Sequence, residues 1–450
     1  MAQCYRHLWF GCVAYALIAG VGAPLAQAQS AFGSWNENPA WLDDRERAEG
    51  PGLRAGDLEL HPGVGAEVGW DSNVYYEESN PQDSAVLRVS PHLLLTTLNQ
   101  QRMDEAEADE LPGIVFSAGL SGSLYHYFID EARDNLSAAG ELDLHINPKR
   151  PFSLRLYDQF SRTIRPFTQA VRGGNPYNFG RNRNVVGVEA SLFSRGNIIG
   201  GTLGYSFGID IFDDNVFQFG NSLQHTISGN ASWRFLPETA LVYETNLYLT
   251  NYSNPNDVDA TSLLVDNERY HSRLGINGAL TQQLSFSVFG GYAVGFYAVA
   301  EEYDGLTALA ELRWRPKETL TLAAGYDRDY FTSFIGNFYS RDRGYTRLEL
   351  FLGGSVLLGF EGDVGYYDYG VTLQPDGTLL GNTPSRDDIR VTGRLFAEYR
   401  LRSWVAVTAS LAYTSSFTDF TYRVDGPAGV IFDPAKYNKF EAWLGTRVFF

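Results

Sequence analysis

The sequence predicts an all-β protein, a closed, antiparallel, up-and-down transmembrane β-barrel of about 18 strands (roughly 16–18) with short periplasmic turns and long extracellular loops. Three features predict it: an amino-terminal export segment, apolar residues at every second position, and connections that alternate between short and long. The 450 residues include 27 Tyr, 29 Phe and 46 Gly. After the export segment, no stretch approaches the ~18 consecutive apolar residues of a membrane helix.

The first 28 residues have the pattern of a secretory signal peptide. Arg6 precedes a mostly apolar run, Leu8 to Leu25, and a small-x-small triplet ends at Ala28. We expect cleavage after Ala28 rather than retention as a membrane anchor, because the run contains Gly and Pro and ends at this site. Cys4 and Cys12 both lie in this segment, and the residues before Cys12 match a lipoprotein signal poorly. The exported chain is therefore expected to lack disulfides, thiol chemistry and lipidation.

Two regions are expected after the signal peptide. Residues 29–60 combine tryptophans, a charge run and Gly/Pro breaks, which predicts a periplasmic amino-terminal extension. Residues 61–450 show strand periodicity and predict the barrel. The expected strands lie near 63–73, 84–97, 113–127, 135–146, 152–162, 182–194, 198–210, 222–235, 239–251, 267–280, 284–297, 304–315, 319–331, 341–352, 355–368, 387–401, 404–416 and 436–450.

The lengths of the connections favour a membrane barrel over a soluble sandwich. Short connections such as 236–238 and 402–403 alternate with long ones such as 163–181 and 369–386. Short periplasmic turns and long external loops are typical of outer-membrane barrels, whereas a soluble β-protein has no reason to alternate them. The acidic connection 98–112 is an exception, because it is long where a short turn is expected.

The carboxyl terminus predicts an outer-membrane destination. Phe450 ends the chain, and Val448 belongs to a row of alternate residues that forms one face of the last strand. Such an ending resembles the signal that the outer-membrane assembly machinery recognises. We expect localisation in the outer membrane of a Gram-negative cell, with membrane lipid, lipopolysaccharide and this machinery as partners.

The opening of the predicted barrel carries a family resemblance. The segment from Leu60 to Tyr75, LHPGVGAEVGWDSNVY, and the following strand from Leu87 to Leu93, LRVSPHL, resemble the start of the porin-2 family of β-barrel proteins. The family's barrel would cover most of residues 60–450, although its specific motifs are confined to the first two strands. Members are often encoded beside exopolysaccharide synthesis and export systems. The resemblance therefore implies exopolysaccharide and its export system as partners.

A wall of charged residues is expected to line the lumen, because polar residues of a membrane barrel face inward. The candidate pore-lining residues are Glu141, Asp143, Arg155, Glu311, Arg313, Arg315, Asp327, Asp329, Arg347, Glu349, Arg390, Arg394, Glu398 and Arg400. A charged wall can orient a passing solute. The alternative is that opposite charges simply pair across neighbouring strands in a wet interior.

The connection 163–181 is the most specific local feature, a basic and aromatic stretch in an acidic protein. The constriction-loop candidates are Arg162, Arg165, Phe167, Arg172, Tyr177, Phe179 and Arg181. In general porins the loop at this position folds inward, and here it would offer guanidinium groups to acidic sugars and rings to sugar faces. The alternative is a surface loop that balances acidic neighbours or binds lipopolysaccharide phosphates.

Composition and spacing disfavour several function classes. A net charge of −18 argues against nucleic acid as a partner. The histidines show no metal-ligand spacing, no cofactor motif is followed by a helix, and no nucleophile constellation emerges. We therefore expect no enzyme, metal or cofactor. The favoured function is a polar conduit linked to exopolysaccharide export or solute passage; the alternatives are a structural or surface-binding barrel with a closed lumen and, less favoured, an outer-membrane hydrolase.

Overall fold

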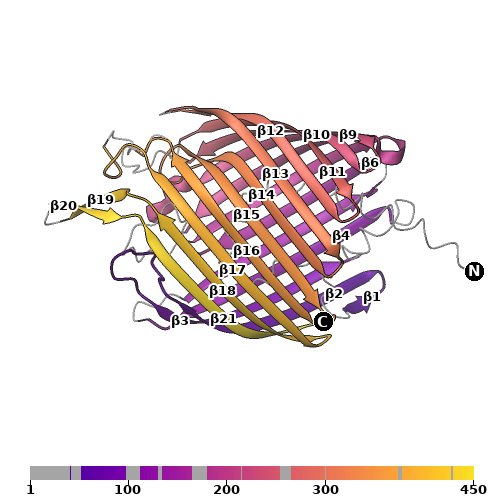
Figure 1. Ribbon diagram of the computed structural model, residues 1–450, viewed down its shortest axis with the longest axis horizontal. Coiled ribbons are helices and arrows are strands. Elements are labelled where there is room, and N and C mark those ends of the chain that lie inside the picture. Colours follow the sequence, from indigo (N-terminus) through magenta and orange to yellow (C-terminus); the bar gives the residue numbers. More distant parts are fainter. Residues whose placement is uncertain are drawn as a thin grey trace, which may run out of the picture.

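The computed structural model describes Trp41 and residues 52–97, 112–129, 134–149, 151–164, 180–213, 215–253, 265–298, 301–372, 378–426 and 429–450. These residues form a closed barrel of 18 antiparallel strands (Figure 1). The strands are β2 (Leu58–Asp71), β3 (Ser84–Thr96), β4 (Ile114–Tyr127), β5 (Asp134–Ile146), β6 (Phe152–Thr163), β7 (Arg181–Phe193), β8 (Ile199–Phe212), β9 (Ser222–Leu236), β10 (Thr239–Tyr252), β11 (Asn267–Thr281), β12 (Leu284–Tyr297), β13 (Tyr303–Lys317), β14 (Leu320–Thr332), β15 (Phe338–Leu352), β16 (Val356–Tyr369), β17 (Asp387–Arg402), β18 (Val405–Phe417) and β21 (Tyr437–Phe449).

Each strand of the wall pairs with its neighbours in sequence, so the topology is up-and-down. The barrel closes where Gly63–Asp71 of β2 pairs antiparallel with Glu441–Phe449 of β21. Closure leaves no open edge, which satisfies the backbone hydrogen bonds of every wall strand. The predicted fold class and strand number are therefore confirmed.

The barrel wall begins earlier than predicted. β2 starts at Leu58, inside the predicted extension 29–60, and its first residues pair with the short strand β1 (Leu53–Ala55). Gly56 makes the tight turn between them with a positive φ of 66°, a conformation that glycine adopts without steric cost. This hairpin extends the wall toward the amino terminus, beyond the point where apolar residues alternate regularly. The alternation alone therefore placed the start of the barrel later in the sequence.

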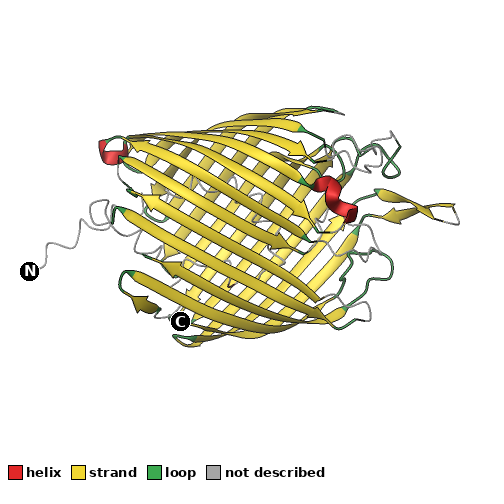
Figure 2. Ribbon diagram, turned by 180° about the vertical axis from the view of Figure 1, so that it is seen from behind, coloured by secondary structure: helices red, strands yellow, loops and turns green. Residues whose placement is uncertain are grey.

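The two ends of the barrel differ. At one end, called the terminal end here, β2 begins and β21 finishes, and short turns such as 237–238 and 403–404 join the strands. At the other end, called the loop end, longer connections emerge, including the hairpin of β19 (Thr421–Gly426) and β20 (Gly429–Pro434). Figure 2 shows this hairpin projecting beyond the end of the wall; the two short 3-10 helices are η1 (Arg195–Asn197) and η2 (Asn215–Gly220).

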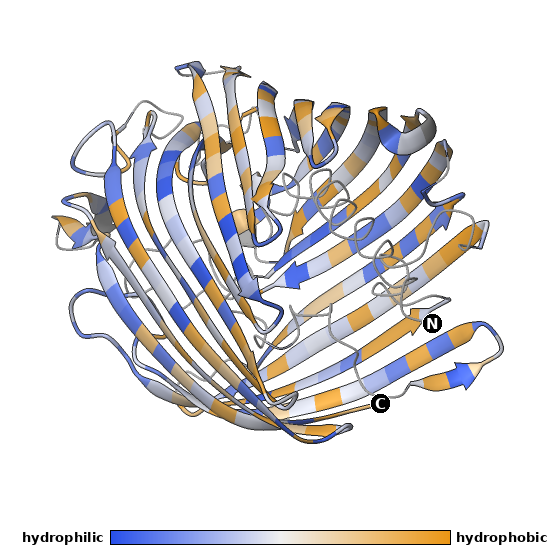
Figure 3. Ribbon diagram, turned by 45° about the vertical axis from the view of Figure 1, so that its right-hand side comes forward, coloured by the Kyte–Doolittle hydropathy of each residue, from blue (hydrophilic) through white to orange (hydrophobic). Residues whose placement is uncertain are grey.

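The two faces of the wall alternate along every strand. Many leucines, valines and aromatic residues point outward and remain exposed, as at Val68 (60%), Leu203 (66%) and Leu306 (70%), whereas charged residues such as Glu67, Arg273 and Asp327 lie on the inner face and are buried. Figure 3 shows the resulting bands of alternating hydropathy along the strands. So large an exposed apolar surface is not stable in water, and it suits contact with lipid. No helix in the described part of the chain is long and apolar enough to cross a membrane.

Part of the loop end is covered by its own packed cluster. Ile335, Leu380, Phe420, Tyr422 and Ala435 are buried together with Tyr369 at the end of β16. The sequence also predicts aromatic belts at the membrane interfaces, formed by Tyr366, Tyr367, Tyr369, Phe417, Phe420, Tyr422, Trp233, Trp314 and Trp404. Tyr366, Phe417 and the three tryptophans are exposed, as a belt requires. The structure corrects the other four, because Phe420 and Tyr422 lie in this cluster and Tyr367 and Tyr369 follow the inward register of β16.

Candidate functional site in the barrel lumen

All of the predicted pore-lining residues lie at inward-facing positions of the wall. Many form ion pairs across neighbouring strands, as the structural alternative expects. On β5 to β7, Arg155 bridges Asp143 (2.5 Å) and Glu189 (3.3 Å), and His145 contacts the same Asp143 at 2.6 Å. Glu141 shares the inward face of β5 with Asp143. Among these residues, three carboxylates accompany one arginine.

On β13 to β18, the terminal half of the lumen is also closely paired. Arg313 contacts Glu311 at 3.0 Å and Arg347 contacts Glu361 at 2.9 Å. Glu398 receives Arg400 and, from β21, Arg447, each at 2.9 Å. Three further predicted residues lie beside these pairs: Glu349 opposite Thr321, Arg394 opposite Glu361, and Arg315 at the exposed end of β13.

Toward the loop end, two arginines converge on one carboxylate at several places. Asp327 of β14 contacts Arg341 (3.2 Å) and Arg343 (2.6 Å) of β15. On the other side of the barrel, Asp210 of β8 contacts Arg181 (2.5 Å) and Arg183 (3.3 Å) of β7. In both cases the arginines are two residues apart, so they share one face of a strand.

Asp329 joins strands that are not neighbours. It extends from β14 to Arg273 (2.7 Å) and His271 (3.3 Å) of β11, from which β14 is separated by two intervening strands. The ring of Tyr330 stacks on His271 at a centroid distance of 4.9 Å and on Tyr303 at 4.1 Å. These contacts bring the loop end of β14 toward β11 across the inner faces of β12 and β13.

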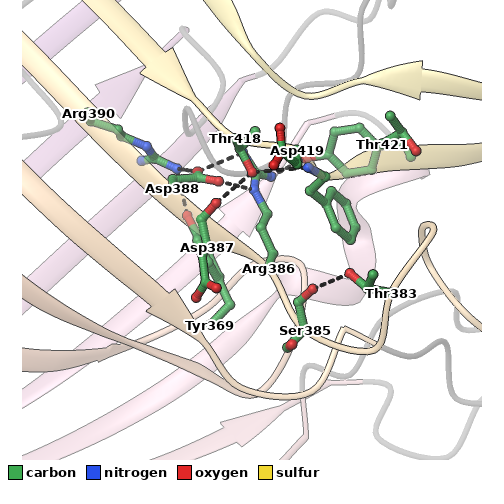
Figure 4. A network of polar contacts seen from close by, with 12 residues as sticks. Tyr369, Thr383, Ser385, Arg386, Asp387, Asp388, Arg390, Thr418, Asp419 and Thr421 are labelled. Carbon is green, nitrogen blue, oxygen red and sulfur yellow. Dashed lines mark hydrogen bonds and ion pairs between the residues drawn. The ribbon is translucent and has the colours of Figure 1, made fainter.

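Figure 4 shows a third arginine pair around one carboxylate, at the start of β17. Arg386 binds both oxygens of Asp388, at 2.7 and 2.8 Å, and Arg390 donates to the same group at 2.7 Å. Arg386 also donates to the Tyr422 hydroxyl and Arg390 to the Tyr369 hydroxyl. Burial opposes the charge of Arg386, but Tyr422 and Asp388 raise its pKa above the usual value, so it stays protonated. This network fastens the loop-end cluster to the wall.

Arg269 of β11 differs from these arginines. Its side chain is 3% exposed and its guanidinium lies over the ring of Tyr248, 4.8 Å from the centroid. Its Nε and Nη1 atoms have no hydrogen-bond partner in the part of the chain that the structure describes. A buried guanidinium with free donors is costly to maintain, because desolvation is not repaid by hydrogen bonds.

The predicted constriction loop is described only at its two edges. Arg162 follows the outward register of β6, where it contacts Asp213 (2.6 Å) and Asn182 (2.9 Å). This corrects its predicted place in a constriction, because an odd-numbered position of β6 would be needed to face the lumen. Arg181 does face inward. The remaining candidates, Arg165, Phe167, Arg172, Tyr177 and Phe179, lie outside the described residues.

Trp41, from the predicted extension, lies inside the terminal end of the lumen. Its indole is 2% exposed and packs against His92 (5.2 Å between centroids) and the guanidinium of Arg447 (5.1 Å). Gly65 makes this approach possible, because a Cβ atom there would lie 2.4 Å from the indole. A second glycine of the same strand, Gly63, makes room in the same way for His92. The glycine pattern that opens the barrel therefore accommodates rings packed against β2.

Several luminal residues were not predicted. Arg269, Arg273, Arg341 and Arg343 were missed, although their spacing of two or four residues places each pair on one strand face. That spacing is a signal that sequence reasoning can use. Trp41 carried no such signal. Among the described residues, no group of three or more His, Cys, Asp or Glu side chains is arranged to hold a metal ion.

Comparisons with known proteins give structural likeness alone. No family model matches the chain, and no curated protein matches it. Among solved structures, OccK5 (OpdH) of Pseudomonas aeruginosa is 9% identical, covers 87% of this chain and 98% of its own, and has a TM-score of 0.45. OccAB3 of Acinetobacter baumannii is 11% identical with coverages of 88% and 100% and a TM-score of 0.44. The siderophore receptor PirA of P. aeruginosa is 10% identical, with coverages of 87% and 80% and a TM-score of 0.41. At these identities and TM-scores the resemblance assigns no function to this chain.

Proposed function

We propose that this barrel is a polar conduit of the Gram-negative outer membrane. The observation that carries the proposal is the distribution of polarity in the wall: many apolar side chains are exposed outside, and many charged side chains face inward and are buried. A soluble barrel would bury the apolar face instead. The export segment supports delivery across the inner membrane. The charged interior supports passage of hydrophilic solutes.

The first experiment measures single-channel conductance of the refolded residues 29–450 in a planar bilayer. A conduit gives a steady, ohmic conductance. Absence of conductance at all voltages contradicts the conduit and supports the closed-lumen barrel, for which the contacts of Asp329 and Tyr330 with β11 offer a structural basis. Deletion of residues 165–179 tests the constriction loop, because removing a constriction raises conductance.

The narrower proposal is a role in exopolysaccharide export. It is supported by the sequence resemblance to the porin-2 family and by the many luminal arginines, which suit acidic polymers. The test is release of polymer from proteoliposomes, comparing oligomers of an acidic polysaccharide with neutral dextran of the same length. Preferential release of the acidic oligomers supports export. Equal release of both, or of small ions alone, contradicts it and leaves a general conduit.

A further inference from the structure

We infer that Arg183, Arg269 and Tyr248 form the centre of an anion-binding site on the luminal wall, and that its ligand is a carboxylate-bearing sugar. The inference rests on the proposed conduit and names the class of solute that the conduit recognises. Arg269 is the starting point, because a buried guanidinium without hydrogen bonds to the described chain needs an anionic partner from elsewhere.

The surrounding charges favour an anion. Arg183 and Arg181 both contact Asp210. Hydrogen bonds lead from Arg183 to Gln224 and on to Thr250, which lies opposite Asn267, two residues before Arg269 on the same strand face. Three guanidinium groups thus lie in one region of the wall, where two of them share one carboxylate, although the whole chain has a net charge of −18. Like charges held together in a partly desolvated wall repel, and an anion relieves that repulsion. A second carboxylate supplied by a solute fits this arrangement.

The neighbouring uncharged groups favour a sugar over a simple inorganic ion. Arg183 also donates to the amide oxygen of Gln224, which in turn donates to Thr250 at 3.3 Å. The amide oxygen of Asn267 is buried and has no hydrogen-bond partner among the described residues. An open acceptor of this kind matches a sugar hydroxyl group.

The tyrosine ring adds a surface for the apolar face of a sugar. Tyr248 lies under the Arg269 guanidinium and packs edge-on against His271 at 5.7 Å. Its ring is therefore held in position from two sides. Flat rings of this kind bind the C–H face of a pyranose, while a planar guanidinium pairs with a carboxylate through two parallel hydrogen bonds.

The luminal arginines around Asp388 and Asp143 have carboxylate partners in the chain, unlike Arg269. The two that bind Asp388 are fixed by charge-assisted bonds of 2.7–2.8 Å, and Arg155 is held between two carboxylates. Arg155 is also an inward-facing arginine of the same wall. It is therefore a matched control for Arg269, with the same charge but with carboxylate partners in the chain.

The test is binding of sodium galacturonate to the full mature protein in detergent, followed by saturation-transfer difference NMR, with galactose and galactose 6-phosphate as comparison probes. We expect galacturonate to bind, and galactose to bind at least about tenfold more weakly, because it lacks the carboxylate. Arg269→Gln should weaken galacturonate binding about tenfold, and Arg155→Gln should change it less than about twofold. Arg269→Lys should bind with intermediate strength, because it keeps the charge and loses the planar fork.

Three outcomes overturn the inference: equal binding of galacturonate and galactose, equal or stronger binding of galactose 6-phosphate, or equal loss in the Arg269→Gln and Arg155→Gln variants. Correct folding of each variant is checked by heat-dependent mobility in gel electrophoresis. Conductance measured on the same protein separates the two proposals. If the barrel conducts but does not bind galacturonate, the anion-binding site is contradicted and the conduit is supported. If it binds galacturonate but does not conduct, the conduit is contradicted and the site is supported.

Discussion

Two regions of the lumen differ in how their buried charges are paired. At the closing seam, formed by β2, β3 and β21, two buried cations each have their own carboxylate: Arg88 contacts Glu67 at 2.6 Å, and Lys439 contacts Asp71 at 2.6 Å. On the wall from β7 to β11, Arg181 and Arg183 share Asp210, and Arg269 has no hydrogen-bond partner among the described residues. Both regions are buried and charged, so burial alone does not distinguish them.

The aromatic contacts sharpen the difference. At the seam, rings cover pairs that are already neutral: Trp443 lies 4.1 Å from the Arg88 guanidinium, and Tyr76 lies 4.3 Å from the Lys439 ammonium. On the β7–β11 wall, Tyr248 lies beside a charge that has no such pair. A matched pair with a covering ring stabilises the junction of the first and last strands. An unmatched cation beside a ring instead remains available to bind an anion.

The largest expected effect follows from breaking a seam pair. Arg88→Met leaves the buried Glu67 without its cation, and breaking a buried pair costs about 3–5 kcal/mol. We expect a matching loss in the free energy of unfolding, measured by urea titration in phospholipid bilayers. Arg269→Met removes a guanidinium that has no carboxylate to leave behind, so it should cost much less. Equal losses at the two positions would contradict the distinction between seam and wall.

A control separates charge pairing from the packing of Arg88 against Trp443. The double variant Arg88→Met, Glu67→Leu removes both charges while it keeps apolar volume, and such replacements of buried pairs are often neutral or stabilising. It should recover most of the stability lost in the single variant. Failure to recover would assign the loss to the cation–π contact instead.

The loop-end network of Figure 4 should give a smaller and local effect. Asp388→Asn removes the carboxylate that Arg386 and Arg390 share, and we expect local opening of the cluster with a cost of about 2–3 kcal/mol. Limited proteolysis should then cut the connection between β18 and β21 faster, while the barrel keeps its heat-dependent gel mobility. Thr383→Val, which removes an exposed hydrogen bond to Ser385, is the control and should leave the cleavage rate unchanged. Faster cleavage in both variants would show that the Asp388 network does not hold the cluster.

Trp41 tests whether the terminal end of the lumen is narrowed by the chain itself. Trp41→Ala removes an indole buried against Gly65, and Gly65→Ala should displace the same indole, because the added Cβ would lie 2.4 Å from it. Each should raise single-channel conductance, by roughly twofold or less. Gly393→Ala is the matched control, because a Cβ there meets nothing within 4 Å. Unchanged conductance in both test variants would show that Trp41 does not limit passage.

Much of the fold could be predicted from the sequence, because lipid outside and water inside impose a strict alternation on each strand. β12 was predicted at 284–297 and lies at Leu284–Tyr297, and the predicted luminal charges share the inward faces. A period of two identifies the face of a residue but does not identify its partner. The face of Asp329 was predictable, whereas its contacts with β11 depend on how the end of β14 crosses the inner wall.

The candidate site was harder to predict for the same reason. Arg183 and Arg269 are far apart in sequence, and the register of four strand pairings from β7 to β11 brings them together. Trp41 lies outside any strand, so no periodicity marked it. Arg162 is a different case. The basic stretch was recognised from the sequence, but Arg162 occupies the strand position next to an inward-facing one, so its side chain lies on the outer face.

The smallest expected effect concerns ion selectivity and tests the comparison most directly. An unmatched luminal cation attracts anions, so Arg269→Gln should lower the chloride-to-potassium permeability ratio by roughly twofold in dilute salt. The measurement is the reversal potential across a bilayer with a KCl gradient. The shift should shrink in 1 M salt, where the screening length falls to about 3 Å. Arg269→Lys keeps the charge and should leave the ratio unchanged. An equal shift in both variants would show that the shape of the side chain, and not its unmatched charge, sets the selectivity of this wall.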